Sequence, residues 1–223
     1  MYRLEMHAHT AGVSACAHTP PEGLVRRLID AGYHGVVVTN HINCQTFRDM
    51  PDAPWRDKAA FVFTGYADTL RAARGEIDVL LGGEVNLAGA PNDYMIYGLT
   101  LEKLIALGDP REYDVKTLCA RAHESGMLVY QAHPMRFHSR LVNPADGLDG
   151  YEVFNGNRNH CSHNALAALW AKDMALPAIS GSDFHDDAFI LNGGIETRER
   201  VRDNDQLLSV LRRGDYRLIQ AQT

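Results

Sequence analysis

Paired cysteines are missing from this chain. Its four cysteines, Cys16, Cys44, Cys119 and Cys161, lie far apart and form no C-x-x-C pair, which argues against a disulfide framework and a structural zinc finger. No run approaches the roughly 20 apolar residues that a membrane span needs. The first residues also lack the apolar core of a secretion signal. We therefore expect a cytoplasmic protein without membrane contact.

Blocks of basic residues are also missing. The 22 lysines and arginines are outnumbered by 28 aspartates and glutamates, which gives a formal net charge of −6 and argues against binding to duplex nucleic acid. The nucleotide-binding loops G-x-G-x-x-G and G-x-x-x-x-G-K-[ST] and the serine-hydrolase elbow G-x-S-x-G do not occur. With 223 residues, 45% of them hydrophobic, the chain is expected to form one domain, residues 1–223, around its own core.

Short β-rich runs alternate with longer helical stretches, which is typical of a parallel sheet with crossover helices. The expected strands are 4–7, 35–39, 77–81, 93–97, 127–132, 150–154 and 177–180, with 216–220 as a candidate terminal strand. The expected helices are 20–31, 57–74, 115–125, 164–172 and 206–213, the first of them starting with a capping box of Thr19 and Glu22. This pattern implies a closed barrel or a doubly wound sheet, and both place function at the C-terminal ends of the strands.

Histidine is abundant, with 11 residues, and many histidines follow the expected strands. The strand-end motifs are His7-Ala8-His9, Thr39-Asn40-His41, Gly82-Gly83-Glu84, Pro91-Asn92-Asp93, His133-Pro134 and Gly181-Ser182-Asp183-Phe184-His185. Because residues i and i+2 of a strand point the same way, His7 with His9, and Asp183 with His185, can each hold one ion. Imidazole nitrogen together with carboxylate oxygen suits Zn, Mn or Fe better than Ca or Mg. More ligands than one ion can use indicate a cluster of ions.

This order of motifs resembles that of the PHP (polymerase and histidinol phosphatase) family and spans nearly the whole chain. The resemblance implies an α/β fold, a distorted (β/α)7 TIM-like barrel with the active site at the C-terminal ends of the strands. It also implies two to three divalent metal ions and hydrolysis of phosphoesters. By the same resemblance the first ion is held by His7, His9, Glu84 and Asp183, the second by His18, His41 and His185, and the third by His133 with Glu84.

Two positions depart from the pattern of the family. Asn40 stands where the family usually has aspartate, which we expect to alter the charge around the ligands rather than the ligation itself. Asp93 stands near the place of a family histidine and is our candidate for an oxygen ligand there. In the loop after the first strand, Cys16 lies close enough in sequence to compete with His18.

Arginines near the strand ends are candidates for holding a phosphate, because guanidinium binds phosphate through two hydrogen bonds. Arg136 follows His133, and Arg158 follows the sixth strand. At the end of that strand, Asn155 could orient the substrate or cap the next helix. The residues expected to act in catalysis are Glu84, Asp183, His185, Arg136 and Arg158.

These observations favour a metal-dependent hydrolase that cleaves phosphoester bonds. The expected substrate is small, a phosphomonoester or a nucleotide-like compound, with a short oligonucleotide as a further candidate, and the expected nucleophile is a hydroxide that bridges two metal ions. An amidohydrolase-like metal hydrolase and a non-catalytic metal-binding scaffold are the alternatives. The sequence leaves the exact substrate, the physiological metal and the oligomeric state open.

Overall fold

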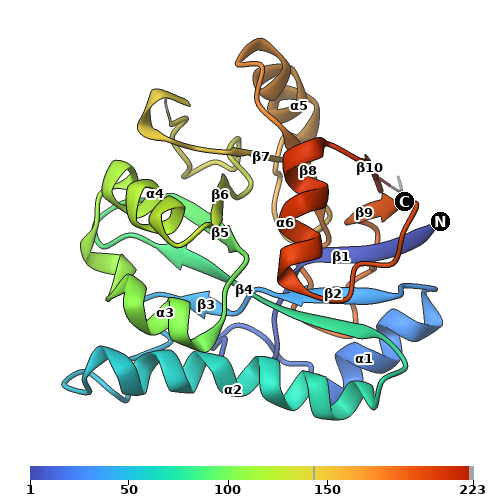
Figure 1. Cartoon of the computed structure of the whole chain (residues 1–223), viewed down its shortest axis with the longest axis horizontal. Coiled ribbons are helices and arrows are strands. Elements are labelled where there is room, and N and C mark those ends of the chain that lie inside the picture. The colour runs from blue at the N-terminus through green and yellow to red at the C-terminus, as the bar shows by residue number, and fades with distance from the viewer. Residues whose placement is uncertain (143, 221–223) are drawn as a thin grey trace.

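Buried apolar runs build a central sheet that curves into an almost closed barrel (Figure 1). The computed structural model describes residues 1–142 and 144–220. The strands are β1 (Tyr2–Ala8), β2 (Gly35–Val38), β3 (His41–Ile42), β4 (Asp78–Asn86), β5 (Asp93–Tyr97), β6 (Leu128–Gln131), β7 (Gly150–Asn155), β8 (Ala178–Gly181), β9 (Ile195–Thr197) and β10 (Tyr216–Leu218). The helices are α1 (Pro21–Asp30), α2 (Trp55–Ala73), α3 (Leu101–Leu107), α4 (Val115–Glu124), α5 (Asn164–Asp173) and α6 (Asn204–Arg213). Every residue of β2 and β6 is buried, as in strands covered on both faces.

The strands follow the order β10-β9-β1-β2-β4-β5-β6-β7-β8, and β3 pairs with β4 beyond the end of β2. β1, β2 and β4 are parallel neighbours, as are β6, β7 and β8. The barrel closes where the chain after β8 pairs with the end of β1. There the Phe184 N–H donates to the His7 carbonyl (3.2 Å), and the His9 N–H donates to the Phe184 carbonyl (2.9 Å). The α/β barrel expected from the sequence is confirmed.

β5 corrects the expectation of an all-parallel sheet, because it runs antiparallel to both β4 and β6. Only residues 87–92 connect β4 to β5, and this connection is too short for the crossover that two parallel strands require. As a consequence, the start of β5 lies at the rim where the other strands end.

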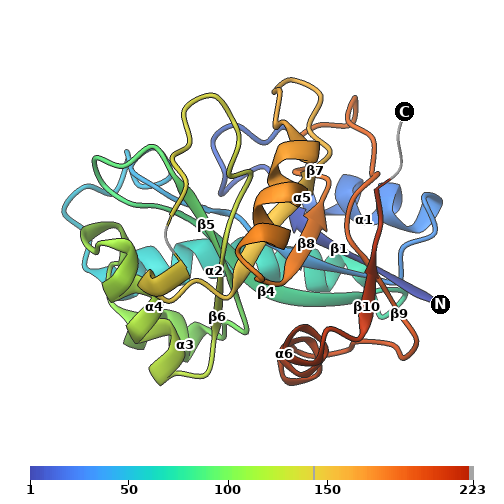
Figure 2. The ribbon, with the colours of Figure 1, turned by 90° about the horizontal axis from the view of Figure 1, so that it is seen from above.

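α6 packs against the other end of the barrel. Its Leu207, Leu208 and Leu211 are buried in one cluster with barrel residues such as Tyr97 and Tyr130. Figure 2 shows α6 on one side of the sheet and the loops that follow β1, β6 and β8 on the opposite side. Apolar side chains therefore fill the barrel from the α6 end, and the polar strand ends gather at the opposite rim.

The start of α1 differs from its sequence prediction. Pro20 occupies the N-cap position without a side-chain hydrogen bond to the described residues, and Pro21 begins the helix. The capping box is therefore wrong: the Thr19 hydroxyl instead donates to Asp187 (3.2 Å), which joins the loop after β1 to the loop after β8. The short elements β3, α3 and β9 were also missing from the prediction.

Among residues 1–142 and 144–220, no helix combines the length and the apolar character that crossing a membrane would require.

Candidate metal centre

The pairing that closes the barrel also aligns two pairs of metal-ligating side chains. The closing bridge is formed by Ala8 and Phe184. His7 and His9 flank Ala8, and Asp183 and His185 flank Phe184. His7 and His9 share a side because alternate residues of a strand do, whereas Asp183 reaches them from a left-handed backbone conformation (φ = 52°). His7 Nε2 lies 3.4 Å and His9 Nε2 lies 3.5 Å from Asp183 Oδ1.

Glu84 lies at the centre of the cluster, where β4 continues past β2 and pairs with β3. It is 1% exposed and stands in register with His41. Its carboxylate lies close to ring nitrogens of four histidines, His7 (3.4 Å), His9 (3.3 Å), His41 (2.9 Å) and His133 (3.0 Å). Glu84 can therefore share metal ions with histidines that come from different strands.

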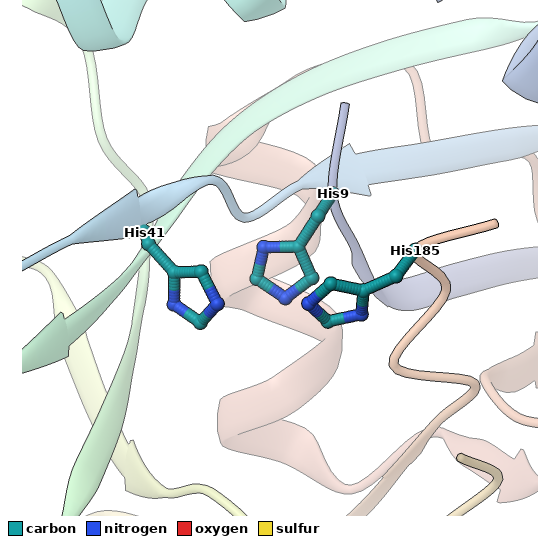
Figure 3. A group of neighbouring side chains, drawn as sticks. All are labelled: His9, His41 and His185. Carbon is teal, nitrogen blue, oxygen red and sulfur yellow. The ribbon is translucent and has the colours of Figure 1, made fainter. Parts of the chain in front are cut away.

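The ligand atoms form three overlapping groups, within each of which all atoms lie within 4.8 Å of one another. The groups are His7–His9–Glu84, His9–His41–His185 and Glu84–Asp93–His133. In the second group, the ring of His9 lies between the rings of His41 and His185 (Figure 3). His9 and Glu84 each belong to two groups, so ions bound in neighbouring groups would share ligands.

Asp93 reaches this cluster because β5 is antiparallel. It pairs with Asn86 at the end of β4, and its carbonyl accepts the Ala132 N–H (3.0 Å). This places Asp93 Oδ2 3.7 Å from His133 Nε2. The structure therefore brings Asp93 to the position of an oxygen ligand beside His133.

Hydrogen bonds around the cluster leave ring nitrogens free to bind a cation. His7 Nδ1 lies 2.8 Å from Glu152 Oε1 and donates its proton to this carboxylate, so His7 Nε2 is the ring nitrogen that faces the cluster. His9 Nδ1 lies 3.3 Å from Ser14 Oγ, whose own proton is donated to Asn40 Oδ1 (2.9 Å). The His9 lone pair is thus on Nε2, only 3.0 Å from His7 Nε2. A proton or a metal ion between these two nitrogens would hold them at this distance.

Two buried polar atoms without hydrogen-bond partners mark a second place where a cation would fit. Glu84 Oε2 and His41 Nδ1 are 2.9 Å apart, yet neither has a hydrogen-bond partner within the described part of the chain. Buried polar atoms are normally hydrogen-bonded. The residues present therefore fit divalent metal ions, which would satisfy both atoms.

The charges of the cluster shift the pKa values of its members in opposite directions. Burial alone would raise the pKa of Glu84, but the facing His7 and His41 hold it well below the usual range. Burial lowers the pKa of His9, and the neighbouring His185 and His41 lower it further. Metal binding needs ionised carboxylates and neutral imidazoles, which is how Glu84 and His9 stand at neutral pH. Burial alone would lower the pKa of His7 and His41, but the facing carboxylates raise it well above the usual range, so a bound metal ion would displace a proton from each of these two rings.

Two of the ligands have strained backbones. Asp183 has φ = 52° and His133 has φ = 28°, in the left-handed region that residues other than glycine rarely adopt. Such a conformation costs about 1–3 kcal/mol and persists only where the surroundings enforce it. Strain at these two positions is typical of residues held for function.

Glu152 in β7, a buried carboxylate that is 1% exposed, is a further residue of the site that the sequence motifs do not include. It accepts hydrogen bonds from His7 Nδ1 (2.8 Å), the His133 backbone N–H (2.9 Å) and the Asn155 side-chain amide (2.9 Å). Asn155 also donates to Asp183 Oδ2 (3.1 Å), so it orients a candidate ligand. An acidic residue inside an apolar strand was the available signal, because a buried carboxylate needs partners.

Replacing Glu152 with glutamine is expected to weaken metal affinity by about 10- to 100-fold, because the group that fixes the His7 ring loses its charge. Zn²⁺ titration against a competing chelator measures this. The exposed Glu124→Gln variant, on α4, is the control. Equal affinity in both variants would remove Glu152 from the metal centre.

His18 is a correction to the predicted ligand set. Its side chain is exposed, and the three groups found among residues 1–142 and 144–220 do not include it. The loop after β1 is held through its backbone, since the His18 N–H donates to the His185 carbonyl (2.8 Å). In the group with His41 and His185, the third imidazole is that of His9.

Six of the candidate ligands line a cavity of about 230 Å³, namely His41, Glu84, Asp93, His133, Asp183 and His185, whereas His7 and His9 are fully buried. Arg136 lines it too, and its guanidinium binds Asp183 Oδ2 (2.7 Å) and Asn155 Oδ1 (3.1 Å). Arg158 is exposed, and the cavity wall is built by its neighbours Asn157 and Asn159 instead, which corrects its prediction as a phosphate clamp.

Cys16 lies at the mouth of the same cavity. Burial raises the pKa of its thiol, but hydrogen bonds with His185 and His41 outweigh this effect and lower the pKa to about 6.

Comparison with known proteins gives one sequence match and several similar folds. Residues 162–216 match a family model described as PHP-associated. No functionally curated protein matches the chain.

The fold resembles that of a two-domain protein from Bacteroides vulgatus that contains a predicted PHP-like metal-dependent phosphoesterase (TM-score 0.70, 16% identity, 98% of this chain and 64% of that chain). This chain thus spans less than two thirds of that protein. A candidate metal-dependent phosphoesterase from Bifidobacterium adolescentis is also similar (TM-score 0.61, 17% identity, 95% of this chain and 96% of that chain). An amidohydrolase from Chromobacterium violaceum with bound sulfate and no metal is a third (TM-score 0.58, 14% identity, 93% of this chain and 96% of that chain). At these identities the likeness shows a shared fold.

Proposed function

Given the assignment to the PHP family, which the family-model match and the shared fold support, we propose that this chain is a metal-dependent phosphoesterase acting on a small phosphorylated substrate. The observation that carries the proposal is the set of three overlapping ligand groups around one cavity, joined by His9 and Glu84. Sharing of ligands supports a site for two or three ions rather than one.

The ligand groups assign the chain's residues to the ions. His7, His9 and Glu84 would hold one, His9, His41 and His185 a second, and Glu84, Asp93 and His133 a third. Bound divalent ions would supply Lewis-acid activation of water and neutralise charge on the phosphate oxygens.

The other side chains of the cavity suit a phosphate. Two or three divalent ions carry more positive charge than Glu84, Asp93 and Asp183 can balance, which leaves a site that attracts anions. Arg136 adds a further positive charge, held in place by Asp183 and Asn155. A guanidinium fixed in this way can orient a phosphoryl group and stabilise charge that develops on it.

The size of the cavity favours a small group. Its volume of about 230 Å³ is below the roughly 300–1,000 Å³ of sites that enclose a drug-sized ligand. A phosphate group fits inside, and the rest of the substrate would lie at the open rim. This geometry suits a phosphomonoester, including the terminal phosphate of a nucleotide or a short oligonucleotide.

An amidohydrolase is the second candidate, supported by the fold likeness to the Chromobacterium violaceum protein. Metal-activated water can attack a carbonyl carbon as well as phosphorus. The fixed Arg136 guanidinium favours the phosphoesterase, because a neutral amide does not need this charge.

The test combines metal analysis with a substrate screen. Protein purified without chelators is expected to bind two to three equivalents of Zn, Mn or Fe, measured by mass spectrometry. The loaded protein should hydrolyse p-nitrophenyl phosphate or nucleoside monophosphates, lose this activity in EDTA, and regain it when the metal is restored. Turnover of amides alone would favour the amidohydrolase. Two to three equivalents of metal without turnover of any phosphoester or amide would favour the metal-binding scaffold. Less than one equivalent of metal after reconstitution would contradict the metal centre.

A further inference from the structure

An aromatic side chain, that of Phe189 in the loop after β8, forms part of the wall of the cavity that the candidate ligands line. Among the described residues that line this cavity, Phe189 is the only one with a purely hydrocarbon side chain. Its ring lies beside a candidate ligand, since the ring centroids of Phe189 and His185 are 6.2 Å apart. An apolar surface therefore borders the place where the phosphate of a substrate would be held.

Phe189 is held in place by the protein itself. Its backbone N–H donates to the Asp186 carbonyl (2.8 Å), and its own carbonyl accepts a hydrogen bond from the Arg27 side chain of α1 (2.8 Å). The half-buried side chain packs against a cluster of buried residues that includes Leu24 and Leu28. Part of Phe189 thus contacts the core while part of it lines the cavity. Because Phe189 is already ordered, a ligand that packs on it pays little conformational entropy.

The loop after β7 supplies polar groups to the same cavity, among them Asn157 and Asn159. The Asn159 N–H donates to Asn157 Oδ1 (3.0 Å), and the Asn157 side-chain amide donates to Asp183 Oδ2 (3.4 Å), which ties the loop to a candidate ligand. Asn159 is exposed, so its side-chain amide is open to hydrogen bonds with a ligand. An apolar ring and a free amide in one cavity wall suit a flat ring that has polar atoms on its edge.

We propose that the substrate carries an aromatic ring close to its phosphate, and that this ring stacks on Phe189 while the phosphate lies at the metal centre. This inference rests on the proposed phosphoesterase function and specifies the substrate class of that site. Aromatic rings stack favourably when their centroids lie about 4.5–7 Å apart. A nucleobase and a simple aryl group share this chemistry, whereas a sugar or alkyl group in the same place gains no such stacking.

Two pairs of matched phosphomonoesters test the preference. Adenosine 5′-monophosphate is compared with methyl riboside 5-phosphate, which has a methoxy group in place of the base. Benzyl phosphate is compared with cyclohexylmethyl phosphate, which has a saturated ring. All four esters release a primary alcohol, so the chemical step is similar within each pair. The metal-loaded wild type is expected to show kcat/KM about tenfold or more higher for the aromatic member. A preference in the first pair identifies a nucleobase, and a preference in the second pair alone identifies a simple aryl group.

Phe189→Leu removes the ring but keeps an apolar contact with the core. This variant is expected to lose the roughly tenfold preference, mainly through a higher KM for the aromatic substrate. Phe137→Leu is the matched control and should keep the preference, because Phe137 is 88% exposed and is not among the residues that line the cavity. The ratio of kcat/KM values within a pair is independent of the fraction of active enzyme. A variant that is partly unfolded or poor in metal therefore still reports on stacking.

The outcomes separate this inference from the proposed function. Equal kcat/KM values within both pairs overturn the aromatic subsite and leave the phosphoesterase intact. A preference that persists in Phe189→Leu, or that falls equally in Phe137→Leu, also overturns the role of Phe189. A metal-loaded chain that hydrolyses no phosphoester overturns the proposed function, and this inference with it.

Discussion

Replacing Glu84 with glutamine is expected to remove metal binding and lower kcat/KM by about 10³-fold or more. The carboxylate lies within 3.4 Å of ring nitrogens from His7, His9, His41 and His133, and it belongs to two of the three ligand groups. An amide has the same shape but carries no charge and only one acceptor oxygen. One substitution therefore removes the group that joins the ions to one another.

The measurement pairs metal stoichiometry with steady-state kinetics on the phosphoester identified in the screen. The exposed Glu124→Gln variant is the matched control, because it makes the same chemical change on the surface of α4. Circular dichroism of both variants checks that the fold is retained. Full metal content and full activity in Glu84→Gln would contradict the central role of this carboxylate.

Replacing Gly193 with alanine is expected to destabilise the fold by about 3 kcal/mol or more, beyond the usual cost of overpacking. A Cβ atom at this position would clash with the backbone of β8 at Gly181 and would lie 2.5 Å from the Ser182 nitrogen. Backbone atoms cannot rotate away as a flexible side chain can. The segment before β9 would have to move off β8, and the adjoining Asp183 would lose its place among the ligands.

Urea unfolding measures the change in the free energy of unfolding. Gly126→Ala is the matched control, because Gly126 has φ = 71° but open space where a Cβ would lie. It should cost about 1–2 kcal/mol, from the left-handed backbone alone. A free energy of unfolding for Gly193→Ala within 1 kcal/mol of wild type would contradict the close packing of the two segments.

Local sequence patterns were sufficient to predict most of the elements and most of the side chains that meet at the rim of the barrel. The run of β2 is apolar throughout and that of β6 is apolar up to Gln131, and both are short enough to be recognised as buried strands. The spacing in His7-Ala8-His9 aligns two side chains, because alternate residues of a strand share a side. In Asp183-Phe184-His185 the left-handed backbone of Asp183 (φ = 52°) places the carboxylate, which spacing alone does not predict. The structure brings these four residues together with His41, Glu84, Asp93 and His133.

The direction of β5 could not be predicted from such local patterns. An apolar run over Asp93–Tyr97 reads the same in a parallel and in an antiparallel strand. The short connection from β4 decides the direction, and with it which end of the strand reaches the rim. Asp93 therefore lies among the ligands at the start of its strand.

The sequence by itself predicted a site for divalent metal ions, because closely spaced histidines and carboxylates at strand ends are typical metal ligands. Tertiary structure alone decided which of these side chains meet. It set His9 rather than His18 beside His41 and His185, because the loop after β1 is tied down through backbone hydrogen bonds. It also placed Glu152 behind His7, a contact between residues 145 positions apart. Periodicity in the sequence predicts which face of a strand or helix a side chain occupies. Contacts across the barrel depend instead on how the strands are arranged around it.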